Sequence, residues 1–286
     1  MLIPLDSTRT ASLDTLRASI WQGSLTTLEF VDRNERLRTH RYGTRIESWG
    51  WSVDSGRTLV TSCDLLPVSF AAAGGGTEAG WLLASVATPP DERGQGYASK
   101  MLEVLLEQRG DRPWILFSDI GPEFYARWGF ESLPQVSRTV PAGEGEVDLS
   151  AASPAFVSET LGRHRKNGRS LEAEEIDWIA ERYRAFAEFR DLIDVPVILD
   201  AGCEDKPVFV AVDAVRDELA LLWRVPGDAA AVVRAQDAAG ALGLSSVSYW
   251  EPALTGLEGT KPEWPMIRDV AKKLAPVADV QQIDWW

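Results

Sequence analysis

The chain has 286 residues, of which 45% are hydrophobic and 25% are charged, and its formal net charge is −14 at pH 7. This is the composition of a globular protein, so a mostly disordered chain is excluded. The acidic surplus is spread over the whole length and opposes nucleic-acid binding, which needs clustered Lys and Arg. No apolar run reaches the length of a membrane span, so we expect neither a nucleic-acid nor a membrane partner.

Cysteine and histidine are scarce. The two cysteines are Cys63 and Cys203, and the two histidines are His40 and His164. None of these residues has the spacing of a metal-ligand set, so we expect no metal. The N-terminus lacks a basic region followed by an apolar one, which argues against a signal peptide. We therefore expect a cytoplasmic location, where thiols stay reduced.

The hydrophobic pattern of the first half changes once along the chain. Residues 13–20 and 25–37 have helical spacing, and residues 44–53, 58–70 and 81–87 alternate as strands of an antiparallel meander. Pro89 and Pro90 end that sheet. The pattern then predicts a helix over 96–108, a strand over 114–117, a short helix over 121–128 ended by Gly129, and a strand over 132–140.

A second block follows the linker-like run from Pro141 to Glu146. It predicts helices over 154–165 and 172–190, strands over 207–212 and 218–223, an alanine-rich helix over 228–242 and a strand over 246–250. We expect two α+β domains, over residues 1–141 and 150–286. The second domain is the smaller and has the strand order of a degenerate copy of the first. We place it on the substrate side of the first domain or in a homodimer contact.

The segment most typical of a binding site is the turn that joins the strand over 81–87 to the helix over 96–108. It contains Arg93, Gly94 and Gly96. Glycines let backbone N–H groups point inward, and a helix N-terminus carries partial positive charge, so this turn can bind a phosphate or pyrophosphate. No Gly-Lys-Ser/Thr follows, and Gly94-Gln95-Gly96 is followed by Ser99 rather than glycine. These departures exclude a Walker loop and a dinucleotide-binding turn.

The turn resembles a known family. Arg93-x-x-Gly96-x-Ala98 is similar to the acetyl-coenzyme A pyrophosphate loop of the GNAT superfamily of N-acetyltransferases. The run from Phe124-Tyr125 to Gly129-Phe130 is similar to a later motif of that superfamily. The resemblance implies a GNAT fold, in which a mixed and mostly antiparallel central sheet is flanked by helices. It implies acetyl-coenzyme A as co-substrate and no metal.

A narrower resemblance covers nearly the whole chain. The runs over 62–64, 84–102 and 117–125 are similar to the lysine N-acetyltransferase family of fungi, which also has a C-terminal extension. Its tryptophan-rich features recur at 248–252 and 283–286. This resemblance implies free lysine or a lysine-like primary amine as the acceptor. Another amine, such as a polyamine, an aminoglycoside or a protein terminus, stays open, and so does a non-catalytic acyl-coenzyme A-binding regulatory module.

The GNAT resemblance also implies which residues contact acetyl-coenzyme A. Backbone N–H groups near Val86 would hold the thioester and pantetheine arm, the turn would hold the pyrophosphate, and Ser99 would add a hydroxyl. The residues expected to bind the co-substrate are Val86, Ala87, Thr88, Arg93, Gly94, Gln95, Gly96, Tyr97, Ala98, Ser99, Asp119 and Phe124.

Direct transfer of an acetyl group to an amine needs a donor of a proton to the departing thiolate. The resemblance assigns that role to Tyr125, and Asp64 matches an acidic position that relays a proton or holds the substrate ammonium; a water molecule in place of a dedicated base is the alternative. His40 is expected to be a solvated surface residue. Asp119 is expected to contact coenzyme A or to cap the following helix, and the capping role is preferred. A close approach of Trp250 or Glu251 to the mouth between the separating strands would support a second domain that closes over the site.

Overall fold

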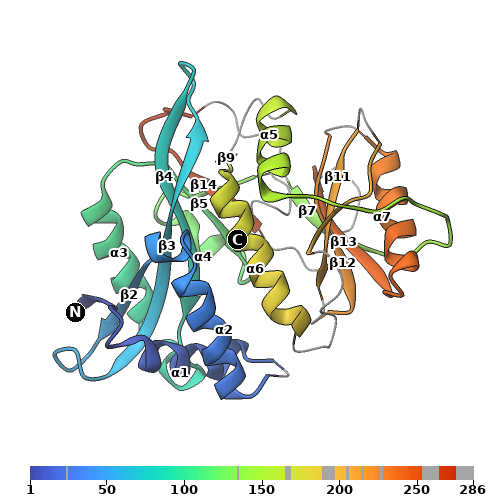
Figure 1. Ribbon diagram of the computed structural model, residues 1–286. Helices are drawn as coiled ribbons and strands as arrows, with labels where there is room; N and C mark the ends of the chain where they lie inside the picture. The colour runs from blue at the N-terminus through green and yellow to red at the C-terminus, as the bar shows by residue number, and fades with distance from the viewer. Residues whose placement is uncertain are drawn as a thin grey trace.

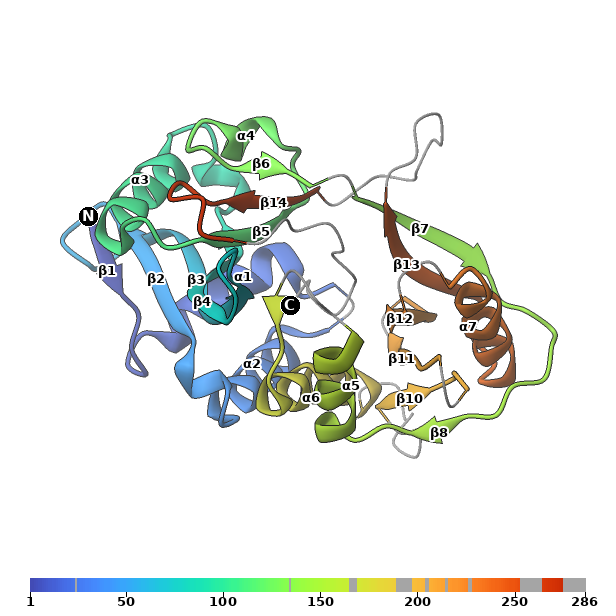
Figure 2. The same ribbon diagram turned by 90° about the horizontal axis from the view of Figure 1, so that it is seen from above.

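The computed structural model describes residues 1–23, 25–133, 135–164, 169–188, 197–203, 206–213, 216–225, 228–252 and 264–274. In these residues the chain forms two mixed sheets with helices packed on both faces of each (Figures 1 and 2). This is the α+β class and the GNAT-type sheet that the sequence predicts. No helix in the described part of the chain is long and apolar enough to cross a membrane.

The first sheet has the order β1-β2-β3-β4-β5-β14-β6. Its strands are β1 (Leu2–Pro4), β2 (Glu47–Ser52), β3 (Leu59–Ala71), β4 (Thr77–Ala87), β5 (Trp114–Ser118), β14 (Trp264–Arg268) and β6 (Glu131–Ser132), and the short β9 (Arg169–Ser170) pairs with β3. Neighbours from β1 to β4 are antiparallel, whereas β4 and β5 are parallel. The parallel pair needs a crossover, which α3 (Tyr97–Arg109) supplies.

The second sheet repeats this plan. Its order is β7-β13-β12-β11-β10-β8, from β7 (Gln135–Pro141), β13 (Ser246–Pro252), β12 (Glu218–Arg224), β11 (Val208–Asp213), β10 (Ile198–Asp200) and β8 (Ser150–Ala151). An antiparallel run β10-β11-β12 is followed by the helix α7 (Ala230–Ala241) and by β13, which is parallel to β12. The second half is therefore a GNAT-like copy of the first, as its strand order predicts.

One strand in each sheet comes from the other half of the sequence. β7 follows β6 along the chain but pairs with β13 in the second sheet, and β14 follows β13 but pairs with β5 in the first. The predicted domains, residues 1–141 and 150–286, therefore do not correspond to the two sheets, because each sheet contains one strand from the other domain.

The helices form three layers around the sheets. The outer face of the first sheet carries α3 and α4 (Glu123–Ala126), and the outer face of the second carries α7. α1 (Thr10–Trp21), α2 (Thr27–Thr39) and the 3-10 turn η1 (Gly43–Arg45) lie on the inner side of the first sheet. α5 (Pro154–His164) and α6 (Ala173–Glu188) lie between the sheets (Figure 2).

One hydrophobic core joins the two halves. It contains Phe70 and Leu82 from the first sheet, Ile179 from α6, and Phe209 and Trp223 from the second sheet, all of them buried. α6 contributes apolar side chains to this core, where they contact residues of both sheets. Packing in the core therefore sets the position of α6 relative to the first sheet.

Candidate functional site

A cavity of about 870 Å³ opens where β4 and β5 separate. Its walls include Leu82 to Val86 of β4, Leu116 and Phe117 of β5, and Tyr125 of α4. Leu82 belongs to the core on the α2 and α6 side of the sheet, whereas Leu83 and Tyr125 belong to the core on the α3 side. The cavity therefore passes through the sheet, from one face to the other.

The opening follows from the pairing of the two strands. β4 and β5 are paired only over Trp81–Leu83 and Trp114–Leu116, although both strands continue. In β4 the register against β3 then shifts, so that Ser85 and Val86 lie opposite Cys63 alone. Ser85 has a positive φ of 52°. A bulge of this kind bends its strand, and here it turns β4 away from β5.

The residues expected along the donor's pantetheine arm lie on this bend. Val86 is half-buried and lines the cavity. Ala87 is buried, and its carbonyl accepts a hydrogen bond from Thr61 Oγ1 at 2.8 Å. The Thr61 and Thr88 hydroxyls also lie 2.8 Å apart. Thr61 thus holds the end of β4 against β3. The other edge of β4 faces the gap between β4 and β5.

The loop after β4 has the geometry of an anion site. The short turn η2 (Pro90–Glu92) leads to Arg93, whose Nε donates to the Thr88 carbonyl at 3.1 Å. Gly94 and Gly96 have φ values of 80° and 73°, and a side chain on either would project into open space. No side chain caps the N-terminus of α3 at Gly96. A helix N-terminus of this kind suits an anion.

The other predicted contact residues lie around this loop or beside the cavity. Tyr97, Ala98 and Ser99 form the first turn of α3, and Gln95 is exposed in the loop. Arg127, which the sequence analysis did not single out, donates to Ser99 Oγ at 3.3 Å and lies over the ring of Phe124 at 4.5 Å. Arg127 thus adds a positive charge beside the predicted pyrophosphate loop.

Tyr125 lines the cavity from the α3 side and is only 6% exposed. Its ring meets Phe124 edge-on at 4.9 Å and Phe130 at 6.0 Å. Burial, reinforced by the nearby Asp119 carboxylate and Cys63, raises the pKa of the Tyr125 hydroxyl above its ordinary value. The hydroxyl therefore keeps its proton at neutral pH, which is the state a proton donor requires.

Asp64 lines the cavity from the opposite face of the sheet. Its carboxylate pairs with Arg17 at 2.7 Å and accepts from Ser48 Oγ at 2.6 Å. Arg17 is a buried charge on α1, one turn after the buried Leu13. Arg17 occupies a position of the helix where the sequence pattern predicts an apolar residue. This departure could have identified Arg17 as a candidate site residue. The Asp64 carboxylate thus faces the cavity as one partner of an ion pair.

Two expectations about individual side chains are wrong. His40 is not a solvated surface residue: its side chain is 16% exposed, its Nε2 lies 3.1 Å from Asp177 on α6, and the Tyr42 N–H donates to its Nδ1. Asp119 does not cap α4, whose N-cap is Pro122 without a side-chain hydrogen bond. Asp119 instead lines the cavity near Tyr125.

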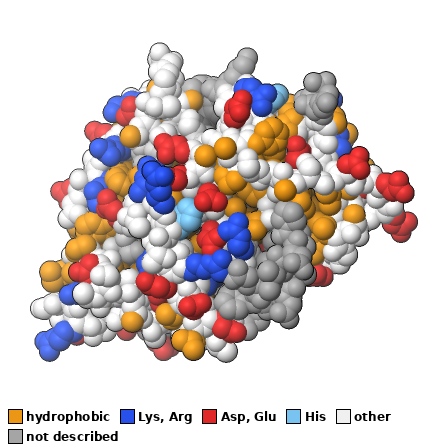
Figure 3. Space-filling view, in the orientation of Figure 1, with side chains coloured by type: hydrophobic (Ala, Val, Ile, Leu, Met, Phe, Trp, Pro, Cys, Tyr) orange, Lys and Arg blue, Asp and Glu red, His pale blue; other side chains and the backbone are white. Residues whose placement is uncertain are grey.

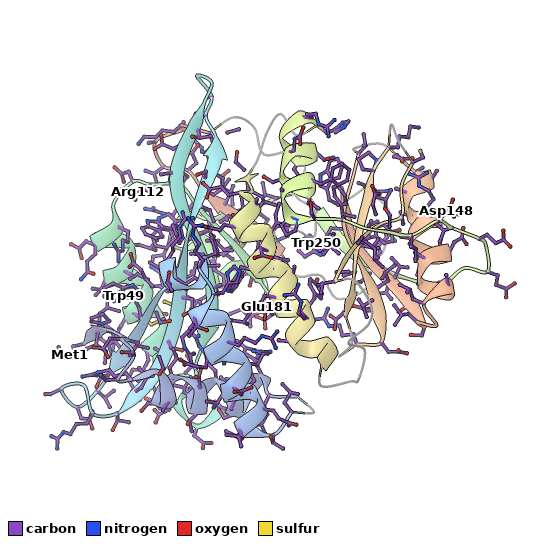
Figure 4. The ribbon with its side chains drawn as sticks, in the orientation of Figure 1. Met1, Trp49, Arg112, Asp148, Glu181 and Trp250 are labelled. Atoms are coloured by element: carbon purple, nitrogen blue, oxygen red, sulfur yellow. The ribbon has the colours of Figure 1, made fainter. Side chains whose placement is uncertain are left out.

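The second half of the chain contributes directly to the cavity. Trp178 and Arg182 of α6 line it, and so does Arg216, which lies between β11 and β12. Ion pairs join α6 and the residue before it to α2 and to residues 40–45. They are Arg36 with Glu181, His40 with Asp177, Arg41 with Glu174 and Arg45 with Glu172. Acidic and basic side chains are interspersed on the face that Figure 3 shows. Glu181 projects from α6 toward α2 (Figure 4).

Trp250 also reaches the first sheet. Its ring meets Phe117, a cavity residue of β5, edge-on at 5.5 Å (Figure 4). This is the approach that we expected of a second domain covering the site. Glu251, the other residue expected there, has a side chain outside the described residues, as has the C-terminal run 283–286.

Comparisons with known proteins agree with this geometry. Residues 19–133 match the family model described as an acetyltransferase (GNAT) domain. No curated protein matches the chain. Among solved structures, a conserved protein from Enterococcus faecalis V583 has a TM-score of 0.62 at 15% identity, over 95% of this chain and 72% of that one.

Further solved structures extend the likeness over nearly the whole chain. A GCN5-related N-acetyltransferase from Anabaena variabilis ATCC 29413 has a TM-score of 0.60 at 11% identity, over 94% of this chain and 72% of that one. Another from Kribbella flavida has a TM-score of 0.57 at 18% identity, over 93% and 70%. At these identities the structures show the fold. The family match is what assigns residues 19–133 to a GNAT acetyltransferase domain, and an enzyme of the acyltransferase class is what that domain supports.

Proposed function

We propose that the protein transfers the acetyl group of acetyl-coenzyme A to the primary amine of a small cationic molecule, with free lysine as the first candidate. The observation that carries this proposal is the cavity through the first sheet, with Tyr125 on one side and the Arg17–Asp64 pair on the other. GNAT acetyltransferases use acetyl-coenzyme A, and the uncapped N-terminus of α3 suits its pyrophosphate.

In the proposed reaction the donor enters from the α3 side, with its pantetheine arm in the gap between β4 and β5. The acceptor enters from the α2 and α6 side. The neutral amine nitrogen attacks the thioester carbonyl carbon, and the C–S bond of the resulting tetrahedral intermediate breaks. The departing thiolate takes the Tyr125 proton, and the amide nitrogen loses its extra proton to Asp64 or to water. Holding both reactants in one cavity supplies much of the rate.

The narrower resemblance to the fungal lysine N-acetyltransferases supports lysine as the first acceptor to test. A polyamine, an aminoglycoside and a protein terminus are the alternatives within the same chemistry. A non-catalytic acyl-coenzyme A sensor is the alternative outside it. A sensor would not need a proton donor, so the presence of a buried tyrosine at the gap favours the enzyme.

The test is mass spectrometry of a mixed amine panel incubated with acetyl-coenzyme A and the protein. The panel contains lysine, ornithine, polyamines, an aminoglycoside and a short peptide. We expect a lysine product that gains one acetyl group, and a loss of turnover of about 10²-fold in Tyr125→Phe with little change in acetyl-coenzyme A binding.

Tyr249→Phe is the matched control, because Tyr249 is also buried but lies in the second sheet, outside the cavity. It should keep full turnover. Acetylation of a different panel member would replace lysine but keep the chemistry. Binding of acetyl-coenzyme A without any acetylated amine would favour the sensor, and unchanged turnover in Tyr125→Phe would remove Tyr125 from the mechanism.

A further inference from the structure

The guanidinium of Arg17 has one nitrogen that no described residue engages. Arg17 belongs to α1, its side chain is 8% exposed, and it lines the cavity. Its Nη1 pairs with Asp64 Oδ2 at 2.7 Å, and its Nε donates to Ser62 Oγ at 3.4 Å. Its Nη2 is buried and has no hydrogen-bond partner among the residues that the structure describes. A buried N–H group is rarely left without an acceptor, so Nη2 is suited to a ligand in the cavity.

Asp64, the partner of Arg17, also has capacity for a ligand. Its Oδ1 accepts from Ser48 Oγ at 2.6 Å, and its Oδ2 pairs with Arg17. Each carboxylate oxygen has two lone pairs, so each can accept one further hydrogen bond. The acidic residue of the same helix, Asp14, is engaged elsewhere, because its oxygens accept from Arg38 at 2.7 and 2.9 Å. The Arg17–Asp64 pair therefore offers a donor and an acceptor side by side.

This pair lies beside the gap between β4 and β5. Asp64 is paired with Ala84 of β4, and the bend of β4 begins at the next residue, Ser85. Two residues along the same face of β3 is Leu66, which is buried in the core with Leu82. All five residues line the cavity. A ligand held by the pair is therefore close to the gap and has an apolar wall next to it.

We propose that the acceptor is an α-amino acid, whose carboxylate accepts from Arg17 Nη2 and whose α-amine donates to Asp64, and that the α-amine is the nitrogen acetylated. This inference rests on the proposed function and selects one of the two amines of lysine. Nη1 and Nη2 are bonded to the same carbon, so ligand groups bound to Arg17 and Asp64 must be close together. In an α-amino acid a single carbon joins the amine to the carboxylate. The zwitterion also matches the charges of the pair, and charge-assisted hydrogen bonds are the strong ones.

The remaining parts of the acceptor fit the same place. An alkyl side chain lies along Leu66 and Leu82, and the amine is next to the gap that we assign to the thioester. The neutral α-amine forms the C–N bond, the C–S bond breaks, and the thiolate takes the Tyr125 proton. The proton that the nitrogen loses goes to Asp64 or to water. Diamines and polyamines, which lack the carboxylate, are poor acceptors.

Blocked forms of lysine test this with the wild-type protein alone. Tandem mass spectrometry of the lysine product should place the acetyl group on the α-nitrogen. Nε-acetyl-lysine should be converted to the diacetyl product, whereas Nα-acetyl-lysine should not react. Lysinamide keeps the α-amine but lacks the carboxylate, and we expect its kcat/KM to be about 10- to 100-fold lower than that of lysine.

Arg17→Lys tests the residue itself, because it keeps a positive charge opposite Asp64 and removes the second guanidinium nitrogen. It should raise the KM for lysine about tenfold or more and change the KM for lysinamide much less. Comparing the two proteins on each substrate cancels the difference in basicity between the two amines. Arg9→Lys is the matched control: Arg9 precedes the same helix, donates to the Gly56 carbonyl at 2.9 Å and is not among the described residues that line the cavity. It should leave both KM values unchanged.

Thermal unfolding without acetyl-coenzyme A gives a readout that is independent of turnover. Nε-acetyl-lysine, which has a free α-amine and a free carboxylate, should raise the Tm of the wild-type protein and of Arg9→Lys. It should not raise the Tm of Arg17→Lys, and Nα-acetyl-lysine should raise none.

The outcomes separate this inference from the proposed function. An acetyl group on the ε-nitrogen of lysine, equal kcat/KM for lysine and lysinamide, or an equal loss for both in Arg17→Lys would overturn the α-amino acid site and keep the acetyltransferase. A Tm shift that depends on Arg17, without acetylation of any amine, would keep the site and overturn the transfer reaction. Faster acetylation of the amino alcohol lysinol than of lysine, or the absence of both acetylation and Tm shifts, would overturn the inference.

Discussion

Tyr125 combines burial with a position at the gap, and this combination has a consequence for the pH profile. Because its pKa is raised, the hydroxyl keeps its proton in the folded state beyond about pH 10, where the same group ionises in the unfolded chain. The stabilisation linked to this shift is fully present below about pH 10 and is lost as pH rises through the folded-state pKa.

We therefore predict that kcat does not fall between about pH 7 and pH 9 through loss of the Tyr125 proton. A plot of kcat against pH at saturating substrates checks this. The control is the same plot for Tyr125→Phe, which should have the same shape at a lower rate. An alkaline fall below about pH 9 that disappears in Tyr125→Phe would show that the tyrosine ionises there and that its pKa is not raised.

Gly96 is the residue whose backbone matters most for the predicted pyrophosphate loop. Its φ is 73°, and a Cβ there would meet no neighbour, so the cost of Gly96→Ala is backbone strain of about 1 kcal/mol. Relief of that strain turns the first N–H groups of α3 away from the anion. We predict a rise in the KM for acetyl-coenzyme A of about tenfold or more, measured by steady-state kinetics.

Gly23→Ala is the matched control for this change. Gly23 also has a positive φ, 56°, and open space around its Cα, but it follows α1, away from the loop. It should lower the free energy of unfolding by a similar amount and leave the KM unchanged. Equal KM values for the two variants would remove Gly96 from co-substrate binding.

At the scale of elements, a buried polar contact joins β9, α6 and η1. Arg169 of β9 pairs with Glu175 of α6, and both side chains are under 5% exposed. Tyr42, next to η1, donates its hydroxyl hydrogen bond to Glu175 Oε1 at 2.9 Å. These partners come from both halves of the sequence, so this contact fixes α6 over the cavity.

We predict that Glu175→Gln destabilises the protein by about 3 kcal/mol, because it removes one charge of a buried ion pair. Urea unfolding of the variant and the wild type measures the difference. Glu172→Gln is the control: Glu172 pairs with Arg45 at 3.2 Å, but the side chains are 62% and 41% exposed, and such pairs contribute about 0–1 kcal/mol. If both variants lost equally little stability, Glu175 would not hold α6 in place.

The sequence was sufficient to predict those helices and strands whose patterns involve only neighbouring residues. Hydrophobic periodicity placed α3, β5 and the β3–β4 meander. The resemblance at Arg93 to Ala98 predicts a pyrophosphate loop before α3, and this role stays a prediction. The cavity wall that contains Arg33 and Arg182 could not be placed in this way, because these residues lie on helices that are far apart in sequence. The misplacement of His40 has the same cause, since its partner Asp177 lies 137 residues away. The roles assigned to Tyr125 and Asp64 stay predictions.

At the scale of the whole molecule, the exchange of β7 and β14 could not be read from the sequence. Both halves repeat a meander, a crossover helix and a parallel strand, so a following strand fits the open edge of either sheet. Local pattern does not distinguish these pairings. Tertiary packing does: Met266 of β14 is fully buried in the core between the first sheet and α3. The N-terminal sheet is therefore completed by the C-terminal part of the chain.

We predict that residues 1–141 do not fold alone, although they contain every residue of the acetyltransferase family match. Without β14, one edge of β5 is unpaired, and β7 lacks the strand on which it lies. Without α6, the apolar face that Phe70 and Leu82 present to it is exposed to water. Circular dichroism during heating should show no cooperative transition for this fragment, and the fragment should aggregate.

The control keeps every strand and changes only the connection between them. A cut after Glu146 falls in an exposed stretch between β7 and β8, so fragments 1–146 and 147–286 together retain both exchanged strands. When co-expressed, they should co-purify and unfold in one transition. Cooperative unfolding of residues 1–141 alone, at a Tm near that of the full chain, would show that the exchanged strand and the shared core are not needed for the first sheet to form.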